Sequence, residues 1–567
     1  MTMSLREADE QLTAPGGMFA VDEIDIRGVR TKVWANAAPS LRAILEMSRA
    51  HGAKDFLVYE DERITFEEHF QRAAHVARRL VDDFGVAKGD RVTIAMRNFP
   101  EWVVAFWAAA AAGAVVVPLN AWWTGEEFAY GLEDSGTRVV FADGERMARL
   151  EGFTPGNVET RIVARPDGPL ADGWLAWDDM MRGADTDASL PDVAIDPEDD
   201  ATIFYTSGTT GKPKGALGTQ RNICTNLTSL MYIAFRQAMR GGGDLIQAAA
   251  SGEQNCYLLS VPLFHATGCH SVLVANTAAG GKLLMMHKWD ATRALELIEQ
   301  ERVTIMGGVP TMAWQIVEHP DFDKYDTSSV RSVSYGGAPA APELVKRIRS
   351  QFPKVSPGNG YGLTETSSVT SLNSGEDYVR KPDSVGSAVP VCDVKVVDEQ
   401  GAEVPAGEVG ELWIKGPNVV KGYWNKPEAT AEAFTDGWLH SGDVARLDDD
   451  GFIYIVDRAK DMVIRGGENV YCVEVEAVLY EHPAVIDAAV FGVPHKVLGE
   501  VVGAVVQIKG GSTVTAEEIR GHVAAHLAGF KVPAFVEVRT GDLPRNPQGK
   551  ILKRDLKEEL IPRWTAS

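Results

Sequence analysis

Short apolar runs alternate with amphipathic stretches along most of the chain. Runs rich in β-branched residues predict buried strands at 92–96, 114–119, 138–142, 201–205 and 303–306. Elsewhere apolar residues recur at helical spacing, as at 65–84 and 292–302. Strands that alternate with helices are typical of mixed and parallel sheets flanked by helices, so we expect an α/β fold.

The pattern changes toward the C-terminus. From about residue 395, short alternating runs predict a β-rich subdomain that begins with a hairpin at 399–401. After Asp457 a second compact unit begins, with a predicted helix at 471–481 and predicted strands at 485–491 and 500–508. We therefore predict a large N-terminal domain (1–457), a hinge (458–460) and a small, mobile α+β C-terminal domain (461–567).

One apolar stretch could be mistaken for a membrane span. Residues 102–119 (WVVAFWAAAAAGAVVVPL) carry no charge, and about 18 residues is the lower limit for crossing a bilayer. However, alanine is a weak hydrophobe, and Gly113 and Pro118 interrupt the stretch. We predict a buried helix to about Ala112, a turn at Gly113 and a buried strand, and no transmembrane segment.

Composition narrows the class of protein. Apolar residues make up 45% and charged residues 24%, which excludes a disordered chain, a collagen and a coiled coil. The formal charge is 56 − 79 = −23, which disfavours nucleic acid and anionic membranes as partners. The five cysteines are widely spaced without a C-x-x-C pair, and residues 256, 265, 269 and 270 match no recognised zinc spacing. Because the polar N-terminus does not resemble a signal peptide, we expect a cytoplasmic protein with reduced thiols.

The strongest local signal is residues 205–215, YTSGTTGKPKG, which follow the apolar run ATIFY. Glycines bring backbone N–H groups close to an anion, while hydroxyls and lysines add donors and charge. The stretch is not a Walker A loop, because Thr206 and Pro213 stand where that motif requires Gly and Ser or Thr. It predicts a polyphosphate site, the alternative being a flexible surface loop.

Seven further motifs follow this loop along the chain. They are PLFH (262–265), YGGAP (335–339), YGLTE (361–365), TDGWLHSGD (435–443), DRAKD (457–461), RGGENVY (465–471) and NPQGK (546–550). In this order they resemble the adenylate-forming (AMP-binding) superfamily, which includes acyl-CoA and aryl-CoA synthetases, the adenylation domains of peptide synthetases and the beetle luciferases. The resemblance covers residues 41–553.

The resemblance implies ATP as a substrate and supplies a nucleotide-binding set. Tyr361 would stack on adenine, Thr364 would contact the α-phosphate, and Asp443 would accept hydrogen bonds from the ribose. The whole expected set is Thr206, Ser207, Gly208, Thr209, Thr210, Gly211, Lys212, Lys214, Gly336, Gly337, Ala338, Gly360, Tyr361, Gly362, Thr364, Asp443, Arg458 and Lys550.

The same resemblance implies the catalytic groups. Lys550 would bridge the attacking carboxylate and the α-phosphate and stabilise the charge that develops there. Glu365 and Thr206 would be the other catalytic residues and would hold Mg²⁺, which prefers hard oxygen ligands. No protein nucleophile is needed for this chemistry.

A second half-reaction with coenzyme A is also implied. The small domain would rotate about Lys460 and present another face, where Gly466, Gly467 and Glu468 would line the path of the pantetheine arm. Lys531 would contact CoA phosphates, or it is simply a solvated lysine.

The acid substrate is the least defined part. The resemblance places His265, Thr267, Gly268, Val309, Met312 and Leu363 around an acyl pocket. None of these is a cation for a second carboxylate, so a hydrophobic monocarboxylic acid is expected, with a medium- or long-chain fatty acid first. Residues 235–255 are expected to form a mobile loop that shapes the tunnel mouth or is a tolerated insertion.

Several alternatives stay open. They are an aryl-CoA ligase, a ligase that loads a separate carrier protein, and a nucleotide-binding protein without turnover. The expected partners are small molecules, and a homodimer is left open.

Overall fold

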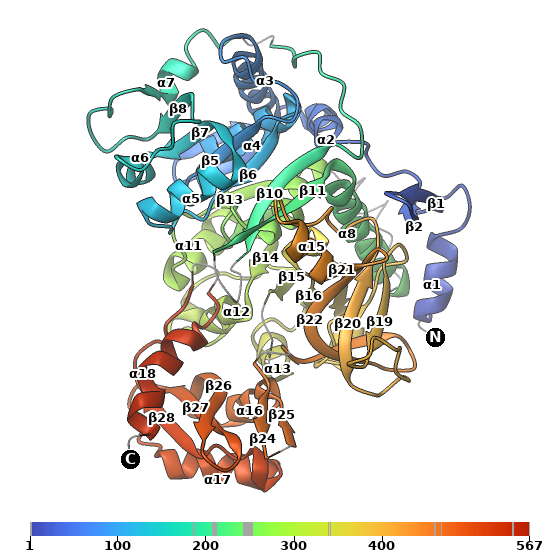
Figure 1. The fold of residues 1–567 in the computed structure, drawn as a ribbon, viewed down its shortest axis with the longest axis vertical. Helices are drawn as coiled ribbons and strands as arrows, with labels where there is room; N and C mark the ends of the chain where they lie inside the picture. The colour runs from blue at the N-terminus through green and yellow to red at the C-terminus, as the bar shows by residue number, and fades with distance from the viewer. Residues whose placement is uncertain are drawn as a thin grey trace.

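The computed structural model describes residues 3–184, 188–206, 212–241, 253–337, 340, 342–458, 461–466, 468–546 and 549–565. Figure 1 shows a large N-terminal body and a small C-terminal domain, drawn in red, below it. The mixed α/β class predicted from the sequence is confirmed. None of the helices in these ranges is long and apolar enough to cross a membrane.

Two large sheets form the body of the N-terminal part. One has the order β11–β10–β6–β5–β7–β8–β9: Lys214–Thr219, Asp200–Thr206, Val115–Pro118, Arg91–Ala95, Thr137–Asp143, Thr160–Ala164 and Trp174–Ala176. The other has the order β17–β16–β15–β14–β12–β13–β3–β4: Ser371–Ser374, Ser356–Tyr361, Ser332–Gly336, Ile305–Gly308, Cys256–Leu259, Lys282–Met285, Asp55–Tyr59 and Glu62–Thr65. Strands β12 to β16 are parallel, so their carboxyl ends meet at one edge.

The uncharged stretch 102–119 lies inside this body. Helix α4 (Pro100–Ala111) packs against α3 (Phe66–Asp82) and α2 (Leu41–Ser48), and it also contacts β5 and β6 of one sheet and β3 of the other. A helix enclosed in this way is apolar on all sides. Gly113 has a φ of 72° and turns the chain into β6, so the predicted helix–turn–strand unit is confirmed.

Further helices connect and cover the strands. They are α5 (Gly125–Ser135), α6 (Gly144–Leu150), α7 (Trp177–Met180), α8 (Gln220–Arg240), α10 (Ala275–Ala279), α11 (Ala291–Glu301), α12 (Pro310–Val317), α13 (Pro342–Gln351) and α14 (Gly375–Arg380). The loop expected at 235–255 is wrong in its first part, because α8 continues to Arg240 and residues 253–255 precede β12. Its middle, 242–252, lies outside the described residues.

The β-rich region follows as predicted. Its sheet has the order β18–β23–β22–β20–β19, namely Gly386–Ser387, Phe452–Arg458, Trp438–Leu447, Gly410–Lys415 and Asp393–Val397, with β21 (Phe434–Thr435) on β22 and α15 (Pro427–Ala433) beside it. The expected hairpin turn is present, since the N–H of Gly401 donates to the carbonyl of Asp398.

The C-terminal domain has its own sheet and core. Its strands are β24 (Val463–Arg465), β25 (Glu468–Val470), β26 (Val485–His495), β27 (Gly499–Ile508) and β28 (Phe535–Arg539), and its helices are α16 (Cys472–Glu481), α17 (Ala516–His526) and α18 (Lys553–Thr565). Thr515 and Glu518 form the predicted capping box. Strand β23 ends at Arg458 and β24 begins at Val463, so the expected hinge falls between two sheets, although its exact bounds stay a prediction and Lys460 lies outside the described residues.

The first forty residues form an extension on the body. Helix α1 (Leu5–Leu12) packs against α8, and the hairpin β1–β2 (Val21–Ile26, Val29–Trp34) lies beside the β-rich region (Figure 1). The indole of Trp34 donates to Ser229, and Lys32 pairs with Asp393 at 2.7 Å. The extension therefore joins two parts of the large domain that are far apart in sequence.

Candidate functional site

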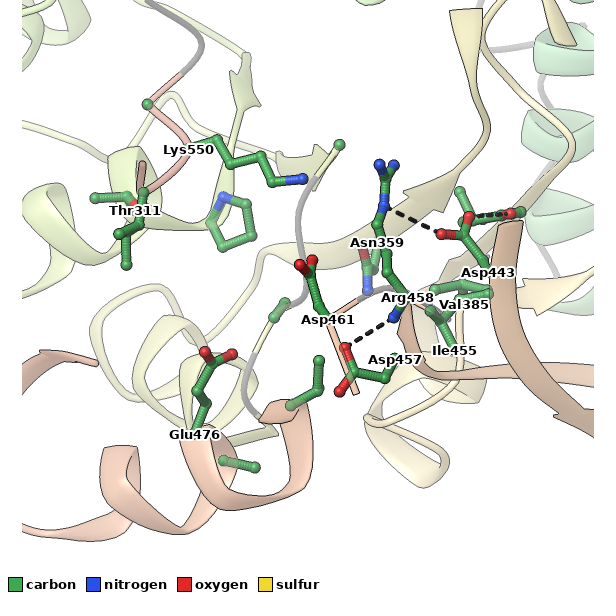
Figure 2. A pocket seen from close by; sticks show the side chains of 18 of the residues that line it. Thr311, Asn359, Val385, Asp443, Ile455, Asp457, Arg458, Asp461, Glu476 and Lys550 are labelled. Carbon is green, nitrogen blue, oxygen red and sulfur yellow. Dashed lines mark hydrogen bonds and ion pairs between the residues drawn. The ribbon is translucent and has the colours of Figure 1, made fainter. Parts of the chain in front are cut away.

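A cavity of about 260 Å³ lies between the large body and the small domain. Residues from five of the motifs and from both parts of the chain line it. They include Gly337, Gly360, Tyr361, Gly362 and Leu363 from the ends of β15 and β16, Asp443 and Arg458 from β22 and β23, and Lys550 from the loop before α18. Figure 2 shows Lys550 reaching toward Arg458 and Asp461 from the opposite wall.

Asp443 organises one wall of this cavity. Its side chain is 4% exposed, and its Oδ2 accepts a hydrogen bond from the Tyr361 hydroxyl at 2.7 Å. Its Oδ1 lies 3.2 Å from Nε of Arg458, the residue directly opposite it on β23. Burial and the Asp443 carboxylate raise the pKa of Tyr361 well above its usual range, so this phenol stays neutral and donates. The wall therefore presents a phenol ring, a carboxylate and a guanidinium side by side.

Lys550 is held by its own loop. Its backbone N–H donates to Oδ1 of Asn546 at 2.9 Å, and its carbonyl accepts from the N–H of Asn546 at 2.8 Å. Burial, with help from Arg458, lowers the pKa of Lys550 to about 8, because the charged ammonium loses water before any anion is present. A nearby phosphate would favour the charged form and raise this pKa again.

The two ends of the phosphate loop lie next to the YGLTE turn. Residues 207–211 (Ser207, Gly208, Thr209, Thr210 and Gly211) lie outside the described residues. At one flank the Thr206 hydroxyl donates to the carbonyl of Lys214 at 3.3 Å. At the other, the Lys214 ammonium lies 5.2 Å from the centre of the Tyr423 ring, and the Tyr423 hydroxyl donates to Oε1 of Glu365 at 2.8 Å. Tyr423 therefore connects the Lys214 end of the loop to Glu365. The Lys212 ammonium lies 4.7 Å from the centre of the Tyr130 ring.

The donor set here fits Mg²⁺. Glu365 supplies a carboxylate and Thr206 a hydroxyl, both hard oxygen ligands, next to a loop rich in phosphate-binding donors. Thr364 lies in the same 3₁₀ turn as Glu365. These residues would hold the ion together with phosphate oxygens.

Close backbone packing explains two of the expected glycines. A Cβ on Gly336 would lie 2.5 Å from the carbonyl oxygen of Gly360, its partner on β16. A Cβ on Gly362 would lie 1.3 Å from the carbonyl oxygen of Ser368. Side chains at either position would displace the YGLTE turn. Ala338 lies outside the described residues.

The expected acyl residues separate into two groups. Leu363 lines the main cavity, whereas Val309 and Met312 border a narrow space of about 10 Å³ with Leu258, Met306 and Tyr335. His265, Thr267 and Gly268 are absent from the described lining of both spaces. Burial lowers the pKa of His265 to about 3, so its ring is neutral, and a Cβ on Gly268 would lie 2.3 Å from the carbonyl oxygen of Pro262.

The expected CoA residues lie away from the main cavity. Gly466 has a φ of 62° in the turn between β24 and β25, Glu468 is exposed, and Gly467 lies outside the described residues. The Lys531 ammonium contacts both oxygens of Glu474 at 2.7 and 2.6 Å. In this arrangement Lys531 is therefore an ion-pair partner within the small domain.

Several lining residues were not expected from the sequence. Thr311, Trp314, Asn359, Asp457, Asp461, Glu476, Tyr480, Asp487, Arg545 and Lys553 all border the main cavity. Asp457 and Asp461 belong to DRAKD, and Arg545 directly precedes NPQGK, so proximity to these motifs was an available signal. Burial raises the pKa of Asp457 to about 6 against the opposing effect of Lys553.

A second cavity of about 550 Å³ adjoins the same loop. Its lining combines the cationic side chains Arg97 and Lys288 with Trp122, His287 and Trp289, and it also includes Asn546 and Gly549. The Arg97 guanidinium lies 4.2 Å from the centre of the Trp122 ring. In a chain with a net charge of −23, this is a local cationic and aromatic surface suited to an anionic ligand.

Comparisons with known proteins agree with this geometry. The family model described as "AMP-binding enzyme" matches residues 45–424, and "AMP-binding enzyme C-terminal domain" matches residues 474–550. A feruloyl-CoA synthase of Amycolatopsis sp is 37% identical over 87% of this chain and 93% of its own. A long-chain-fatty-acid–CoA ligase of Bacillus subtilis is 34% identical over 92% and 94%.

A solved structure gives the same result. The o-succinylbenzoate CoA synthetase of Bacillus subtilis, in complex with its acyl-adenylate intermediate, superimposes with a TM-score of 0.75. It is 31% identical and covers 92% of this chain and 98% of its own.

Fold and site together define an AMP-forming acid–thiol ligase. The chain belongs to the AMP-binding enzyme family, within the adenylate-forming acyl- and aryl-CoA ligases.

Proposed function

We propose that this enzyme converts a hydrophobic monocarboxylic acid to its CoA thioester in two steps. The carboxylate first attacks the α-phosphorus of ATP, forming acyl-AMP and releasing pyrophosphate. The CoA thiol then attacks the acyl carbon, and AMP leaves. The observation that carries the proposal is that Lys550 of the small domain shares one cavity with Tyr361 and Asp443 of the large domain.

The first step follows from the charges around this cavity. Tyr361 and Asp443 would bind the adenine ring and the ribose hydroxyls, while Arg458 would add a ribose or phosphate contact. Lys550 would bind between the carboxylate and the α-phosphate, reducing the repulsion between two anions and stabilising the charge of the transition state. Glu365 and Thr206 would hold Mg²⁺, which spreads the phosphate charge when bound.

The second step requires a different face of the small domain. Rotation at the 458–460 joint would withdraw Lys550 and bring the Gly466 turn and Glu468 to the acyl-adenylate. The cationic cavity around Arg97 and Lys288 supports CoA as the acceptor, because CoA carries three phosphate groups at one end. A separate carrier protein stays the alternative acceptor.

For the acid we propose a medium- or long-chain fatty acid. Leu363, Val385 and Ile455 give part of the main cavity an apolar lining. A second candidate is an aryl acid, which is supported by the 37% identity with a feruloyl-CoA synthase. We also propose a cytoplasmic location, because all five cysteines are free and buried.

An AMP-release assay tests the function directly. The purified enzyme is supplied with ATP, Mg²⁺ and one acid at a time: octanoate, dodecanoate, benzoate or cinnamate, each with and without CoA. We expect AMP and thioester to form together, only with CoA and a suitable acid. Steady AMP release without thioester would favour the carrier alternative, and no acid-dependent product with any acid would contradict the proposal.

The role of Lys550 is tested separately. Lys550→Ala should lower acid-dependent pyrophosphate exchange by at least about 100-fold, because a buried charge that stabilises the transition state is lost. Thioester formation from supplied acyl-AMP should persist. Lys346→Ala, which removes an exposed lysine of α13, is the matched control and should leave both reactions unchanged. Equal loss of both reactions in Lys550→Ala would contradict separate roles for the two arrangements.

A further inference from the structure

Arg545 connects three parts of the molecule at the edge of the main cavity. Its Nη2 forms an ion pair with Asp487 on β26, in the core of the small domain. Its Nη1 donates to the Thr311 hydroxyl on α12 of the large domain at 3.0 Å, and it also donates to the carbonyl of Gly549, next to Lys550. One guanidinium thus contacts the small domain, the large domain and the loop that carries the catalytic lysine.

The loop between Arg545 and Lys550 is short and internally closed. Arg545 and Ile551 form an antiparallel bridge, and Asn546 and Lys550 exchange backbone and side-chain hydrogen bonds. Gly549 has a φ of 80°, and a Cβ added there would lie 2.9 Å from Cγ2 of Val309, so this residue packs closely against the large domain. A displacement of Arg545 would therefore move Lys550 as well.

Hydrogen bonds hold the Asp487 carboxylate in the position where it pairs with Arg545. The carboxylate is buried, and its Oδ1 accepts from the Tyr480 hydroxyl at 2.5 Å and from the N–H of Ala488 at 2.9 Å. The Tyr480 ring in turn stacks on Trp314 of α12, with ring centres 6.2 Å apart and planes 11° from parallel. The contacts form one chain from α12 through Tyr480 and Asp487 to Arg545 and back to α12.

We propose that Arg545 is a positioning residue that places Lys550 for adenylation only while Thr311 of the large domain is within reach. The proposal rests on the two-step function proposed above. Asp487, the Gly549 carbonyl and the Thr311 hydroxyl accept from one side chain, and a guanidinium offers five donors in a fixed planar fork. A lysine at this position supplies one ammonium at the end of a flexible stem and does not reproduce that geometry.

Arg545 also separates the two cavities. Both Arg545 and Gly549 line the main cavity and the cationic cavity, so these two residues lie between them. When the small domain leaves, Arg545 and Gly549 leave with it. The same contact that positions Lys550 therefore limits access from the cationic cavity during the first step.

The test compares the two half-reactions in the same full-length variants. Arg545→Lys should lower the kcat of acid-dependent pyrophosphate exchange by about 10- to 100-fold, the loss typical of a reacting group held about 1 Å out of place. The KM for ATP and the rate of thioester formation from supplied acyl-AMP should change by less than about threefold. Tyr361 and Asp443, which would bind the nucleotide, are unchanged in this variant.

A variant on the other domain keeps the test informative if Arg545 variants fold poorly. Thr311→Val removes the hydroxyl acceptor and should reproduce the selective loss in exchange, and the double variant Arg545→Lys/Thr311→Val should be no slower than Arg545→Lys alone. Lys509→Gln is the control, because it removes a different contact between the domains, the ion pair of Lys509 with Glu318 at 3.3 Å. It should leave both half-reactions unchanged.

Equal slowing of both half-reactions, or additive losses in the double variant, would overturn the role of Arg545. If wild-type enzyme showed no exchange with any acid, the proposed function itself would be wrong.

Discussion

Single side chains in the site depend on contacts that sequence motifs do not contain. The motifs placed Tyr361, Asp443, Arg458 and Lys550 on the expected set, and all four line one cavity. The direct pairing of Asp443 with Arg458 was not predicted, because it follows from the register of β22 on β23, and a bulge at Val444 and Ala445 shifts that register. Motif order gives residue identity, whereas register decides which side chains meet.

The buried position of Lys550 predicts a pH dependence. The protonated ammonium is the active form, and its pKa is lowered to about 8 in the enzyme without nucleotide, mainly by burial. The kcat/KM of pyrophosphate exchange should therefore fall as the pH rises through about 8, well below the value of about 10.4 for an ordinary lysine. The measurement is an exchange profile between about pH 6 and pH 10.

A variant that cannot lose its charge checks the assignment. Lys550→Arg should be slower than wild type, but its kcat/KM should lack the decline near pH 8, because a guanidinium stays protonated throughout this range. A decline of the same size in Lys550→Arg would assign the titration to another group.

At the scale of elements, local patterns were sufficient for most helices and strands. Residues 65–84 and 292–302 form α3 and α11 nearly as predicted, because amphipathic spacing and capping residues act within a few turns. The helix that extends into residues 235–240 was missed, because the glycines at 241–243 suggested a loop that begins earlier. The π-helix at Thr267–Val274 was also missed, since apolar periodicity does not distinguish it from neighbouring helix.

Substitution by alanine should have very different effects at Gly362, in the turn between β16 and Glu365, and at Gly521 in α17. Gly362→Ala would place a Cβ 1.3 Å from the Ser368 carbonyl oxygen, so the backbone must shift and Glu365 must move with it. We expect the free energy of unfolding to fall by about 3 kcal/mol or more. Urea unfolding and pyrophosphate exchange measure the two effects.

Gly521→Ala is the matched control. Gly521 lies inside α17 with no atom within 4 Å of an added Cβ, so alanine should be neutral or stabilise by up to about 1 kcal/mol. Similar losses in both variants would mean that backbone crowding at Gly362 is not the cause.

At the scale of the molecule, the sequence predicted the parts but not how they meet. The second set of predicted strands and helices after Asp457 indicated a small domain, and the DRAKD motif indicated a joint. The contacts of Trp314 with Tyr480 and of Thr311 with Arg545 join residues more than 160 positions apart, and no local pattern encodes such pairs. Gly466 and Glu468 are not among the described residues that line the main cavity, so their expected role with CoA stays a prediction.

A restricted joint should separate the two steps. Lys460→Pro fixes one backbone dihedral and constrains the preceding residue, so rotation should be hindered. We expect thioester formation from supplied acyl-AMP to fall at least about tenfold more than pyrophosphate exchange, because the first arrangement is already formed. Lys460→Ala, which removes the side chain without restricting the backbone, is the control. Equal losses in both half-reactions of Lys460→Pro would show that the joint does not move in this way.

The 44 residues that precede the family match pack tightly against the large domain. Phe19 and Trp34 pack edge-on and tilted against Tyr232 of α8, in a cluster that also includes Val389 and Val391. A chimera that replaces residues 1–44 with the corresponding residues of a relative would remove Phe19 and Trp34 and expose the Tyr232 ring that they cover. In this protein, residues 1–44 and α8 should therefore be exchanged together.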